Sequence, residues 1–414
     1  MENRIRDSRY LGTYFAIRKL NERSLKGPME TLSSFFRKFC VPTILKYVII
    51  IAMKTIIKMI NEQDIDEKIV EKAGDILRAG GLVAFPTETV YGLGADALNK
   101  DAASKTYKAK GRPSDNPLII HIEALEALDE IIEDKPEELE TLAKHFWPGP
   151  LTMIFHKSKV VPLATTGGLE TVAVRMPENR IAREVIRAGG GYISAPSANI
   201  SGKPSPTTAE HVKVDMNERI DMILDGGTVK IGVESTILDM TVTPPMILRP
   251  GAVTRKMLEK VLPRIEIDPA VFSLAEQIEA KAPGMKYRHY APNAPLVIVE
   301  GTSEDVIEAI NIETSHKEKH GIKVGIICTD ESLCQYQASS VKSVGARMDE
   351  TSIAQNLYAI LRKFDEENIE YAFSEAFSEE GIGLAIMNRL CKAAGYRKML
   401  AADIIKSNIT REEN

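Results

Sequence analysis

Short apolar segments separated by glycine and proline recur along residues 82–249, and they limit the folds open to this chain. They are LVAF at 82–85, LIIHI at 118–122, LTMIF at 151–155, TVAVR at 171–175, YISA at 192–195, MILD at 222–225, STILD at 235–239 and MILR at 246–249. Each has the length and apolar content of a buried strand, and helical spacing recurs between some of them. Because several strands follow one another without a helix, we expect an α/β fold whose sheet has mixed strand direction.

Beyond residue 294 the alternation of strand and helix is more regular. PLVIVE, KVGIIC and YAFSEAF are expected strands, and SEDVIEAINI, residues 351–364 and GLAIMNRLCKAAG are expected helices. This order predicts a second, smaller α/β domain with a parallel, doubly wound sheet. The proline-rich stretch APGMKYRHYAPNAP precedes it, and we interpret this stretch as a linker.

Length and charge narrow the class further. A chain of 414 residues suits two or three domains of about 150 residues each. The formal net charge of -5 gives no bulk attraction to nucleic acid or to an anionic membrane, so an anion site must be a local cluster of cations. The four cysteines are scattered without a C-x-x-C pair, which argues against zinc ribbons and a disulfide framework and favours a cytoplasmic location.

The first 52 residues differ from the rest in composition. They contain ten lysines or arginines against four acidic residues and end in the apolar run VPTILKYVIIIAM. That run is too short to cross a bilayer, and Lys46 interrupts it. We therefore expect a poorly ordered extension that is not part of the fold, and we predict no membrane association.

Polar residues follow the first expected strand in the stretch FPTETVYGLGAD. Thr87, Glu88 and Thr89 come directly after the strand, and Gly92 and Gly94 are expected in the following turn. Ligands collect at the carboxyl ends of strands in α/β sheets. The alternative is an ordinary turn, in which glycine supplies positive φ and threonine caps the backbone.

Two loops offer groups that suit phosphate. In KGRPSDNPL, Lys110 supplies a mobile point charge and Arg112 a fork that fits two oxygens. In SAPSANISGKPSPT, small hydroxyl and amide side chains follow the strand YISA, among them Ser197, Asn199 and Ser205. A solvated basic turn and a plain surface loop are the alternatives. The serine of APSAN is not in a G-x-S-x-G turn, which argues against a hydrolase nucleophile.

Other charged residues end or begin strands. Arg175 and Arg249 each end an apolar strand, and with the cations of KGRPSDNPL they predict a cationic cluster on one face of the sheet. Glu234 and Ser235 stand at the start of another strand. His121 alternates with isoleucines, and such a histidine is more often a satisfied core group than a catalyst.

Taken together, these stretches resemble the YrdC-like domain of threonylcarbamoyl-AMP synthases: FPTETVYGLGA, AKGRPSDNPLIIHI, FWPGPLT, TVAVRMP, SAPSANISGKPSPT, GVESTI and LRPGA. GMKYRHYAP and GLAIMNRLCKAAG resemble the linker and C-terminal domain of the long form of that family. The resemblance implies a YrdC-like catalytic domain with a twisted mixed sheet at 58–250, a linker and lid at 251–294, and a Rossmann-like C-terminal domain at 295–403. Residues 1–52 fall outside it.

The resemblance also implies an activity. Members of the family are nucleotidyltransferases that condense L-threonine, bicarbonate and ATP to threonylcarbamoyl-adenylate and pyrophosphate. A downstream threonylcarbamoyl transferase then modifies adenosine 37 of tRNA, so tRNA would be an indirect partner. The implied cofactor is Mg²⁺ carried with ATP, without a metal site made by protein groups alone.

Site residues carry over by position in the matching motifs. The implied catalytic and triphosphate-binding tetrad is Lys110, Arg112, Ser197 and Asn199. The rest of the implied ATP site is Asn116, Thr171, Ser205, Arg249 and Tyr287. The implied threonine site is Thr87, His121, Arg175 and Ser235, with the Arg175 fork on the substrate carboxylate. The proline-bounded segment GMKYRHYAP, with Tyr287 and Arg288, is the expected lid.

Two other hypotheses for the function are compatible with the sequence. A protein that binds double-stranded RNA by shape, or a ribosome-assembly factor, could use a concave basic surface, although the net acidity argues against this as the main role. Carbamoyl-adenylate synthesis of the hydrogenase-maturation type is the nearest alternative among enzymes. Those proteins add an acylphosphatase module and paired C-x-x-C motifs, which this sequence lacks.

Overall fold

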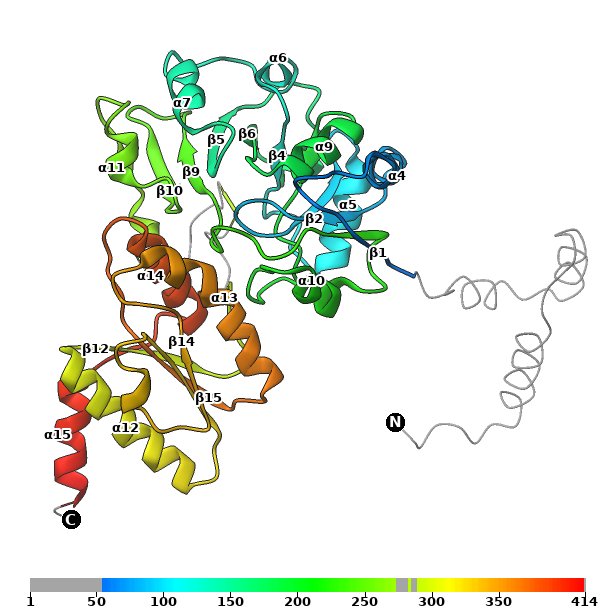
Figure 1. Cartoon of the computed structure of the whole chain (residues 1–414). Helices are drawn as coiled ribbons and strands as arrows, with labels where there is room; N and C mark the ends of the chain where they lie inside the picture. Colours follow the sequence, from blue (N-terminus) through cyan, green and yellow to red (C-terminus); the bar gives the residue numbers. More distant parts are fainter. Residues whose placement is uncertain (1–53, 273–281, 284–288, 413–414) are drawn as a thin grey trace, which may run out of the picture. The chain divides into compact units, whose positions relative to one another are not determined.

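The computed structural model describes residues 54–272, 282–283 and 289–412, which fold around two sheets (Figure 1). The larger sheet contains β1 (Ile56–Met59), β2 (Val83–Phe85), β3 (Gly92–Asp96), β4 (Ile119–His121), β5 (Leu151–His156), β6 (Thr171–Arg175), β7 (Ile193–Ser194), β8 (Met222–Asp225), β9 (Thr236–Asp239), β10 (Met246–Arg249) and β11 (Glu266–Ile267). The helices along this part of the chain are α4 (Glu67–Arg78), α5 (Lys100–Lys110), α6 (Leu128–Ile131), α7 (Leu139–Phe146), α8 (Leu163–Thr166), α9 (Arg180–Ala188), α10 (Ala209–Met216) and α11 (Arg255–Leu258).

Strand direction in the larger sheet is mixed, as the sequence predicts. The strand order is β1-β8-β2-β3-β7-β4-β6-β5-β9-β10-β11. Parallel pairs such as β4 with β6 and antiparallel pairs such as β5 with β6 both occur in this sheet. The register of β4 with β6 sets His121 opposite Arg175, so two residues that are 54 positions apart in the chain become neighbours.

The expected turn at Gly92 and Gly94 is wrong, because both residues lie in β3, which pairs with β2 in antiparallel fashion. The glycines are needed for close approach and not for positive φ. A Cβ atom at Gly94 would lie 2.6 Å from Cε1 of Phe85. A substituted residue there would push the Phe85 ring out of the core.

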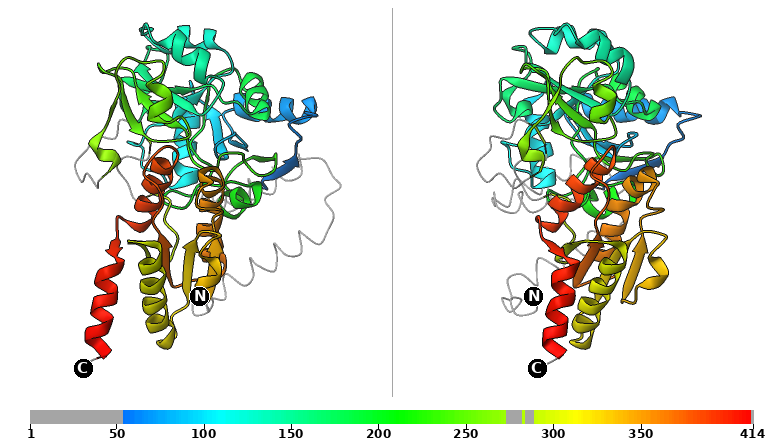
Figure 2. Two further views of the ribbon diagram at one scale, coloured as in Figure 1. Left: turned by 60° about the vertical axis from the view of Figure 1, so that its left-hand side comes forward. Right: turned by 90° about the vertical axis from the view of Figure 1, so that its left-hand side faces the viewer.

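The smaller sheet is fully parallel, with the order β14-β13-β15-β12-β16. Its strands are β12 (Leu296–Glu300), β13 (Val324–Cys328), β14 (Ser340–Ser343), β15 (Tyr371–Glu375) and β16 (Lys398–Leu400), and its helices are α12 (Ser303–Lys319), α13 (Glu350–Glu366), α14 (Gly383–Ala394) and α15 (Ala401–Glu412). Helices α12 and α15 lie side by side (Figure 2) and share one apolar core, whereas α13 and α14 belong to another. The doubly wound arrangement expected from the sequence is confirmed.

Helices α13 and α14 join the smaller sheet to the larger one through a continuous core. Val90 and Val233, which flank strands of the larger sheet, are buried in the same apolar cluster as Leu357 of α13 and Leu390 of α14. The side chain of Gln355 on α13 also donates a hydrogen bond to the carbonyl oxygen of Val229, at 3.1 Å. The C-terminal part of the chain is therefore packed against the larger sheet by apolar and polar contacts.

The segment after residue 250 continues the larger sheet before the chain leaves it. Strand β11 pairs with β10 in parallel fashion, so the sheet extends beyond the bound of 250 expected for the first domain. The first 52 residues and the expected lid residues Tyr287 and Arg288 lie outside the described residues. Within the described ranges no helix is long and apolar enough to cross a membrane.

We predict that Gly232→Ala weakens the packing of α13 against the larger sheet. A Cβ atom there would lie 2.4 Å from the Cα of Gln355 and 2.5 Å from the carbonyl oxygen of Ala354, and backbone atoms cannot give way cheaply. Gly227→Ala is the matched control, because Gly227 has a similar positive φ and no described heavy atom within 4 Å of the added Cβ.

In urea unfolding, Gly232→Ala should lose about 1 to 3 kcal/mol more than Gly227→Ala. Equal losses in the two variants would mean that only the positive φ matters and that the contact with α13 is not tight.

Candidate active site

A pocket opens where the ends of several strands and loops of the larger sheet meet. The lining residues are Thr89, Val90, Lys110, Arg112, Ile119, His121, Arg175, Ala195, Pro196, Ser197, Asn199, Ser201, Gly202, Lys203, Glu234, Ser235, Arg249, Pro283, His289 and Tyr290. They come from segments that are far apart in the sequence, and the last three precede the smaller sheet. The pocket therefore exists only in the folded chain.

The end of α5 supplies the first two cations. Gly111 terminates the helix in the left-handed conformation, with a φ of 61°, so the chain turns directly after Lys110. Lys110 is 1 % exposed, and Arg112 follows the turn into the same pocket. Arg112 donates from Nε to the carbonyl oxygen of Asn116 at 3.1 Å and from Nη2 to the Asn116 side-chain oxygen at 2.6 Å. Asn116 thus orients Arg112 and is not itself a lining residue.

The loop after β7 is held by the lysine across the pocket. Lys110 Nζ donates to the carbonyl oxygen of Asn199 at 2.6 Å and to that of Ser197. The Ser197 hydroxyl donates to Oδ1 of Asn199 at 2.5 Å, and the Asn199 amide donates to the carbonyl oxygens of Ile200 and Lys203. Three residues of the expected tetrad, Lys110, Ser197 and Asn199, are therefore joined by hydrogen bonds. The fourth, Arg112, follows Gly111 in the chain and lines the same pocket.

At the end of β6, Arg175 is held by groups from the β2–β3 connection. Its Nη2 pairs with Oε1 of Glu88, its Nη1 donates to the Thr89 hydroxyl at 2.9 Å, and its Nε donates to the carbonyl oxygen of Gly149 at 3.2 Å. From the sequence, the Arg175 guanidinium is expected to bind the substrate carboxylate. The structure shows that a buried carboxylate already occupies part of it.

His121 lies beside Arg175 in the floor of the pocket and is 2 % exposed. Its Nδ1 is 3.2 Å from the carbonyl oxygen of Ile119. Burial and then the charge of Arg175 lower the pKa of His121 to about 3, so the ring is neutral near pH 7. Because a carbonyl oxygen can only accept, the proton belongs on Nδ1 and Nε2 is left as an acceptor.

The start of β9 and the end of β10 complete the pocket. Arg249 donates from Nε to the carbonyl oxygen of Ser235 at 3.1 Å and from Nη2 to its hydroxyl at 3.2 Å. The Ser235 hydroxyl also lies 2.8 Å from that of Thr152 on β5. Next to Ser235, the Glu234 carboxylate lines the pocket and accepts a hydrogen bond from Ser205 at 2.5 Å.

Helices of the smaller sheet also reach the Glu234 carboxylate. Arg389 of α14 donates from Nε to Oε2 at 2.8 Å, and the Tyr358 hydroxyl of α13 lies 2.9 Å from Oε2 and 3.1 Å from Oε1. Burial alone would raise the pKa of Glu234, but the charges of Arg389 and Arg249 and the Ser205 hydrogen bond outweigh it and lower the pKa to about 2. The carboxylate is therefore ionised at any working pH.

Positive charge dominates the pocket. Among the described lining residues, five are lysine or arginine and Glu234 is the sole carboxylate. Burial, and after it the charge of Arg112, lowers the pKa of Lys110 well below its usual value, and burial lowers the pKa of Arg112 to about 10. His289 is neutral, because burial and then Arg112 lower its pKa to about 3. Such crowded, desolvated cations favour a polyanionic ligand.

The residues expected from the sequence fall into three groups. Those that line the pocket are Lys110, Arg112, His121, Arg175, Ser197, Asn199, Ser235 and Arg249. Those that lie outside the lining are Thr87, Asn116, Thr171 and Ser205. Of these, Thr87 bonds within its own turn to Val90 at 2.7 Å, and Ser205 supports Glu234. Tyr287 lies outside the described residues.

Several contributors were missed. Glu88 and Glu234 stand in the expected site segments without a predicted role, and Tyr358 and Arg389 lie in the second domain, outside the predicted site. A signal for Arg389 was present, since an arginine inside the apolar run GLAIMNRLCKAAG must be paired if that helix is buried. Arg389 is in fact fully buried.

The described residues include no group of three or more histidine, cysteine, aspartate or glutamate side chains that could hold a metal ion. The Glu234 carboxylate has hydrogen bonds to both oxygens, so it is not an open ligand. A divalent cation in this pocket would have to be held mainly by the oxygens of a bound ligand.

Comparison with known proteins gives matches over nearly all the described chain. The family model described as telomere recombination matches residues 75–251, and that described as the C-terminal domain of threonylcarbamoyl-AMP synthase matches residues 253–395. The chain is 50% identical over 343 residues to a threonylcarbamoyl-AMP synthase of Pyrococcus abyssi, covering 83% of this chain and 98% of the relative. It is 48% identical over 330 residues to that of Bacillus subtilis, covering 79% and 93%.

Among solved structures, P. abyssi Sua5 complexed with L-threonine superposes with a TM-score of 0.80 at 48% identity. The match covers 84% of this chain and 99% of that one. The likeness therefore extends over both sheets.

We predict that Arg389→Met destabilises the protein by about 3 to 5 kcal/mol, because it leaves the Glu234 carboxylate buried without its charge partner. Adding Glu234→Gln to that variant should recover part of the loss. The measurement is the free energy of unfolding of the two single variants and the double variant, which gives the coupling between the two residues.

The pH dependence follows from the lowered pKa of Glu234. A carboxylate whose pKa falls from its ordinary 4.5 to about 2 on folding stabilises the folded state fully above pH 4.5, and this contribution is lost as the pH falls toward 2. The stability of Glu234→Gln should therefore vary less between pH 4.5 and 2 than that of the wild type. Identical slopes would contradict the assignment.

Proposed function

Because the chain belongs to the threonylcarbamoyl-AMP synthase family, in the form with an added C-terminal domain, we propose that it condenses L-threonine, bicarbonate and ATP to threonylcarbamoyl-adenylate and pyrophosphate. The observation that carries the proposal is the convergence of five cationic side chains from separate segments on one pocket, next to a neutral histidine. The five cations suit a triphosphate, and the neutral histidine suits an amino acid bound next to it.

The triphosphate is assigned to the side of the pocket with Lys110, Arg112 and Arg249. Guanidinium groups fork onto phosphate oxygens, and the lysine adds a point charge. Lys110 donates its hydrogen bonds to backbone carbonyl oxygens. Among the described residues no carboxylate contacts its ammonium group directly. Ser197 and Asn199 shape the loop that the lysine holds. Asn116 acts by orienting Arg112.

L-Threonine is assigned to the side with His121, Arg175 and Ser235. The related P. abyssi protein has been crystallised with L-threonine, which supports this part of the proposal. The N–H groups of Arg175 that Glu88 and Thr89 leave free can donate to the substrate carboxylate. The Nε2 atom of neutral His121 can accept a hydrogen bond from the substrate hydroxyl or amine.

The reaction then needs positioning and charge neutralisation more than a protein nucleophile. The threonine amine attacks the carbon of bicarbonate, water leaves, and a carboxylate oxygen of the resulting carbamate attacks the α-phosphorus as pyrophosphate departs. Lys110 and Arg112 neutralise charge that spreads over the phosphate oxygens in this displacement. Mg²⁺ carried by the triphosphate would supply further neutralisation, held chiefly by phosphate oxygens because the pocket offers no open carboxylate.

The segment before the smaller sheet is assigned the role of a lid. Its described residues Pro283, His289 and Tyr290 line the pocket, and Nε2 of His289 is buried without a hydrogen-bond partner in the described structure. Tyr290 stacks on Tyr358, with ring centroids 5.3 Å apart, which anchors one end of the segment to α13. A closed lid would keep water from the labile carbamate.

The product is an activated acyl-adenylate, so the next enzyme must be a transferase that accepts the threonylcarbamoyl group. We assign that role to a separate threonylcarbamoyl transferase that modifies position 37 of tRNA, with the reaction taking place in the cytoplasm. tRNA would then meet this chain indirectly. The double-stranded RNA alternative gains no support, since the matched relatives are named as synthases.

The direct test incubates the purified full-length protein with ATP, Mg²⁺, bicarbonate and each standard amino acid in turn. Pyrophosphate release should depend on L-threonine and on bicarbonate, and mass spectrometry should detect threonylcarbamoyl-adenylate. Pyrophosphate release that is the same with every amino acid, or no release under these conditions, would contradict the proposal.

We predict that the two arginines separate the substrates. Arg112→Met should raise the KM for ATP by about tenfold to a hundredfold, through loss of charge-assisted hydrogen bonds, with a smaller effect on threonine. Arg175→Met should act mainly on the KM for threonine.

Arg187→Met is the matched control, because this α9 arginine is 55% exposed and lies outside the pocket. Steady-state kinetics with each substrate varied, and melting temperatures of all three variants, give the comparison. Equal effects of Arg112→Met and Arg175→Met on both substrates would refute the division.

A further inference from the structure

A second cavity lies in the smaller-sheet domain, and none of its lining residues lines the candidate active site. Its lining residues are Val299, Gly301, Ser303, Val306, Ile307, Thr329, Glu331, Ser332, Gln335, Arg347, Glu375 and Ala376. Val299 and Glu375 lie at the ends of β12 and β15, and the other lining residues lie in the first turns of α12 or in the segments that follow β12, β13, β14 and β15. The cavity therefore opens at the carboxyl edge of a parallel sheet.

The cavity lies where the direction of the chain connections changes. From β12 the chain passes through α12 to β13, toward the β14 edge, whereas from the adjacent β15 it passes through α14 to β16, at the other edge. Helices α12 and α14 belong to different apolar cores on the two faces of the sheet. Neighbouring strands whose connections diverge in this way leave a crevice, and ligands of open α/β sheets bind in such crevices.

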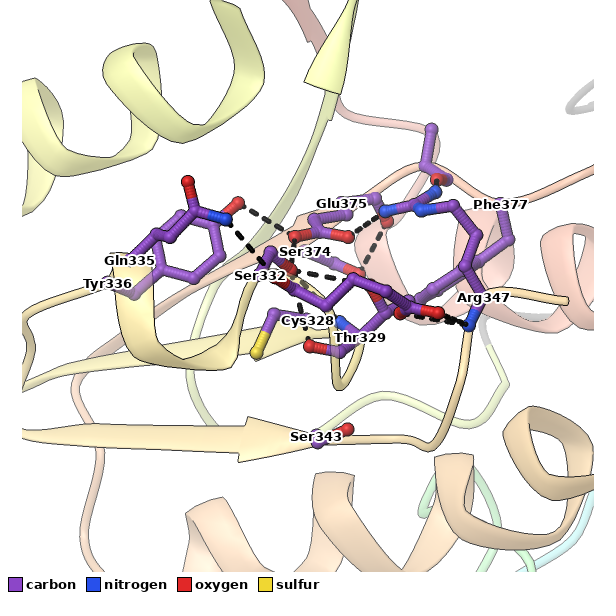
Figure 3. Close-up of polar contacts among 12 residues, drawn as sticks. Cys328, Thr329, Ser332, Gln335, Tyr336, Ser343, Arg347, Ser374, Glu375 and Phe377 are labelled. Atoms are coloured by element: carbon purple, nitrogen blue, oxygen red, sulfur yellow. Dashed lines mark hydrogen bonds and ion pairs between the residues drawn. The ribbon is translucent and has the colours of Figure 1, made fainter. Parts of the chain in front are cut away.

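The floor of the cavity is a buried, charged cluster (Figure 3). Glu375 is 2 % exposed, and its Oε1 accepts hydrogen bonds from the hydroxyl groups of Ser332 and Tyr336, the second at 2.9 Å. Its Oε2 pairs with Nη2 of Arg347. Arg347 also donates from Nη1 to the carbonyl oxygen of Ala376 at 3.2 Å. Two loops and one strand end are thus tied together around one carboxylate.

Arg347 is not fully used by these contacts. Its side chain is 37% exposed, so part of the guanidinium remains open at the cavity. Its backbone N–H contacts the carboxylate of Glu331, at 3.0 and 3.1 Å from the two oxygens, which brings a second negative charge to the rim. The described lining therefore carries one cation and two carboxylates, beside the aliphatic side chains of Val299, Val306 and Ile307.

The arginine and the two carboxylates of the lining together indicate which kind of ligand the cavity can bind. A phosphate would meet two carboxylates with one arginine to offset them, and a simple cation would meet the arginine. A molecule that carries both charges can place its carboxylate on the open edge of Arg347 and its ammonium near Glu331 and Glu375. We propose that this cavity binds a small zwitterion, a free α-amino acid with an aliphatic or small polar side chain. The cavity volume of about 100 Å³ limits the ligand to a small molecule.

The proposal is tested by hydrogen–deuterium exchange of the full-length protein, read by mass spectrometry. The probes are each standard L-amino acid, and inorganic phosphate, acetate and methylammonium as single-charge controls. One or more amino acids should slow exchange in residues 299–307 and 329–335, and the three controls should not. L-Threonine alone is expected to act also on the candidate active site, whose peptides are read separately.

Two variants test the location. Ser303→Trp fills the mouth of the cavity from an exposed position and leaves the pair of Glu375 and Arg347 intact, so it should abolish the protection without unfolding the domain. Arg347→Met should weaken binding by about tenfold or more. Lys342→Met is the matched control, because it breaks an ion pair to Glu367 of 2.8 Å in the same domain but outside the cavity.

Three results would overturn the proposal. They are the absence of protection by any amino acid, equal protection by phosphate or acetate, and protection that persists in Ser303→Trp. The first removes the site, the second makes it a plain anion site, and the third moves the ligand elsewhere.

Discussion

The buried carboxylate of Glu234 is the constraint on which the arrangement of this protein depends. It lies in the lining of the candidate active site, yet its partners come from both parts of the fold: Ser205 from a loop beside the larger sheet, and Tyr358 and Arg389 from helices of the smaller one. An ionised carboxylate without these partners could not be buried at this depth. The pocket and the packing of the two sheets therefore depend on one another, and the C-terminal domain forms part of the wall behind the site.

The Glu234 carboxylate offsets part of the positive charge in and around the pocket. Arg249 and Arg389 are both buried near it, and Lys392, which like Arg389 lies on α14, has its pKa lowered to about 7 by burial and then by those two arginines. One carboxylate cannot compensate all of this charge. Among the described residues, Lys110 donates hydrogen bonds to carbonyl oxygens and not to a carboxylate, so this part of the pocket carries little negative charge. A bound triphosphate would supply what the protein lacks, so affinity for a polyanion is a consequence of how the cations are buried.

How much of this could be predicted from the sequence depends on the range of the interactions involved. Local patterns located most strands, and the expected cluster of Lys110, Arg112, Arg175 and Arg249 was found in one pocket because each residue ends or follows an element whose position in the sheet is fixed. The need for glycine at position 94 could not be predicted from nearby residues, because it comes from Phe85 on a neighbouring strand. The pairing of Arg175 with Glu88 could not be predicted either, because it depends on which strands are adjacent.

The two faces of the smaller sheet have different roles. Helices α13 and α14 pack their apolar sides against the larger sheet and also bond to that part of the chain through Gln355, Tyr358, Arg362 and Arg389, so this face of the smaller sheet is covered. The second cavity is correspondingly at the carboxyl edge, with α12 from the opposite face as one wall. Arg347 lies just before α13, and Tyr358 lies in the middle of that helix, in contact with Glu234. A ligand bound to Arg347 would therefore contact the segment that leads into the helix that supports the candidate active site, so α13 is a direct connection along the chain between the two sites.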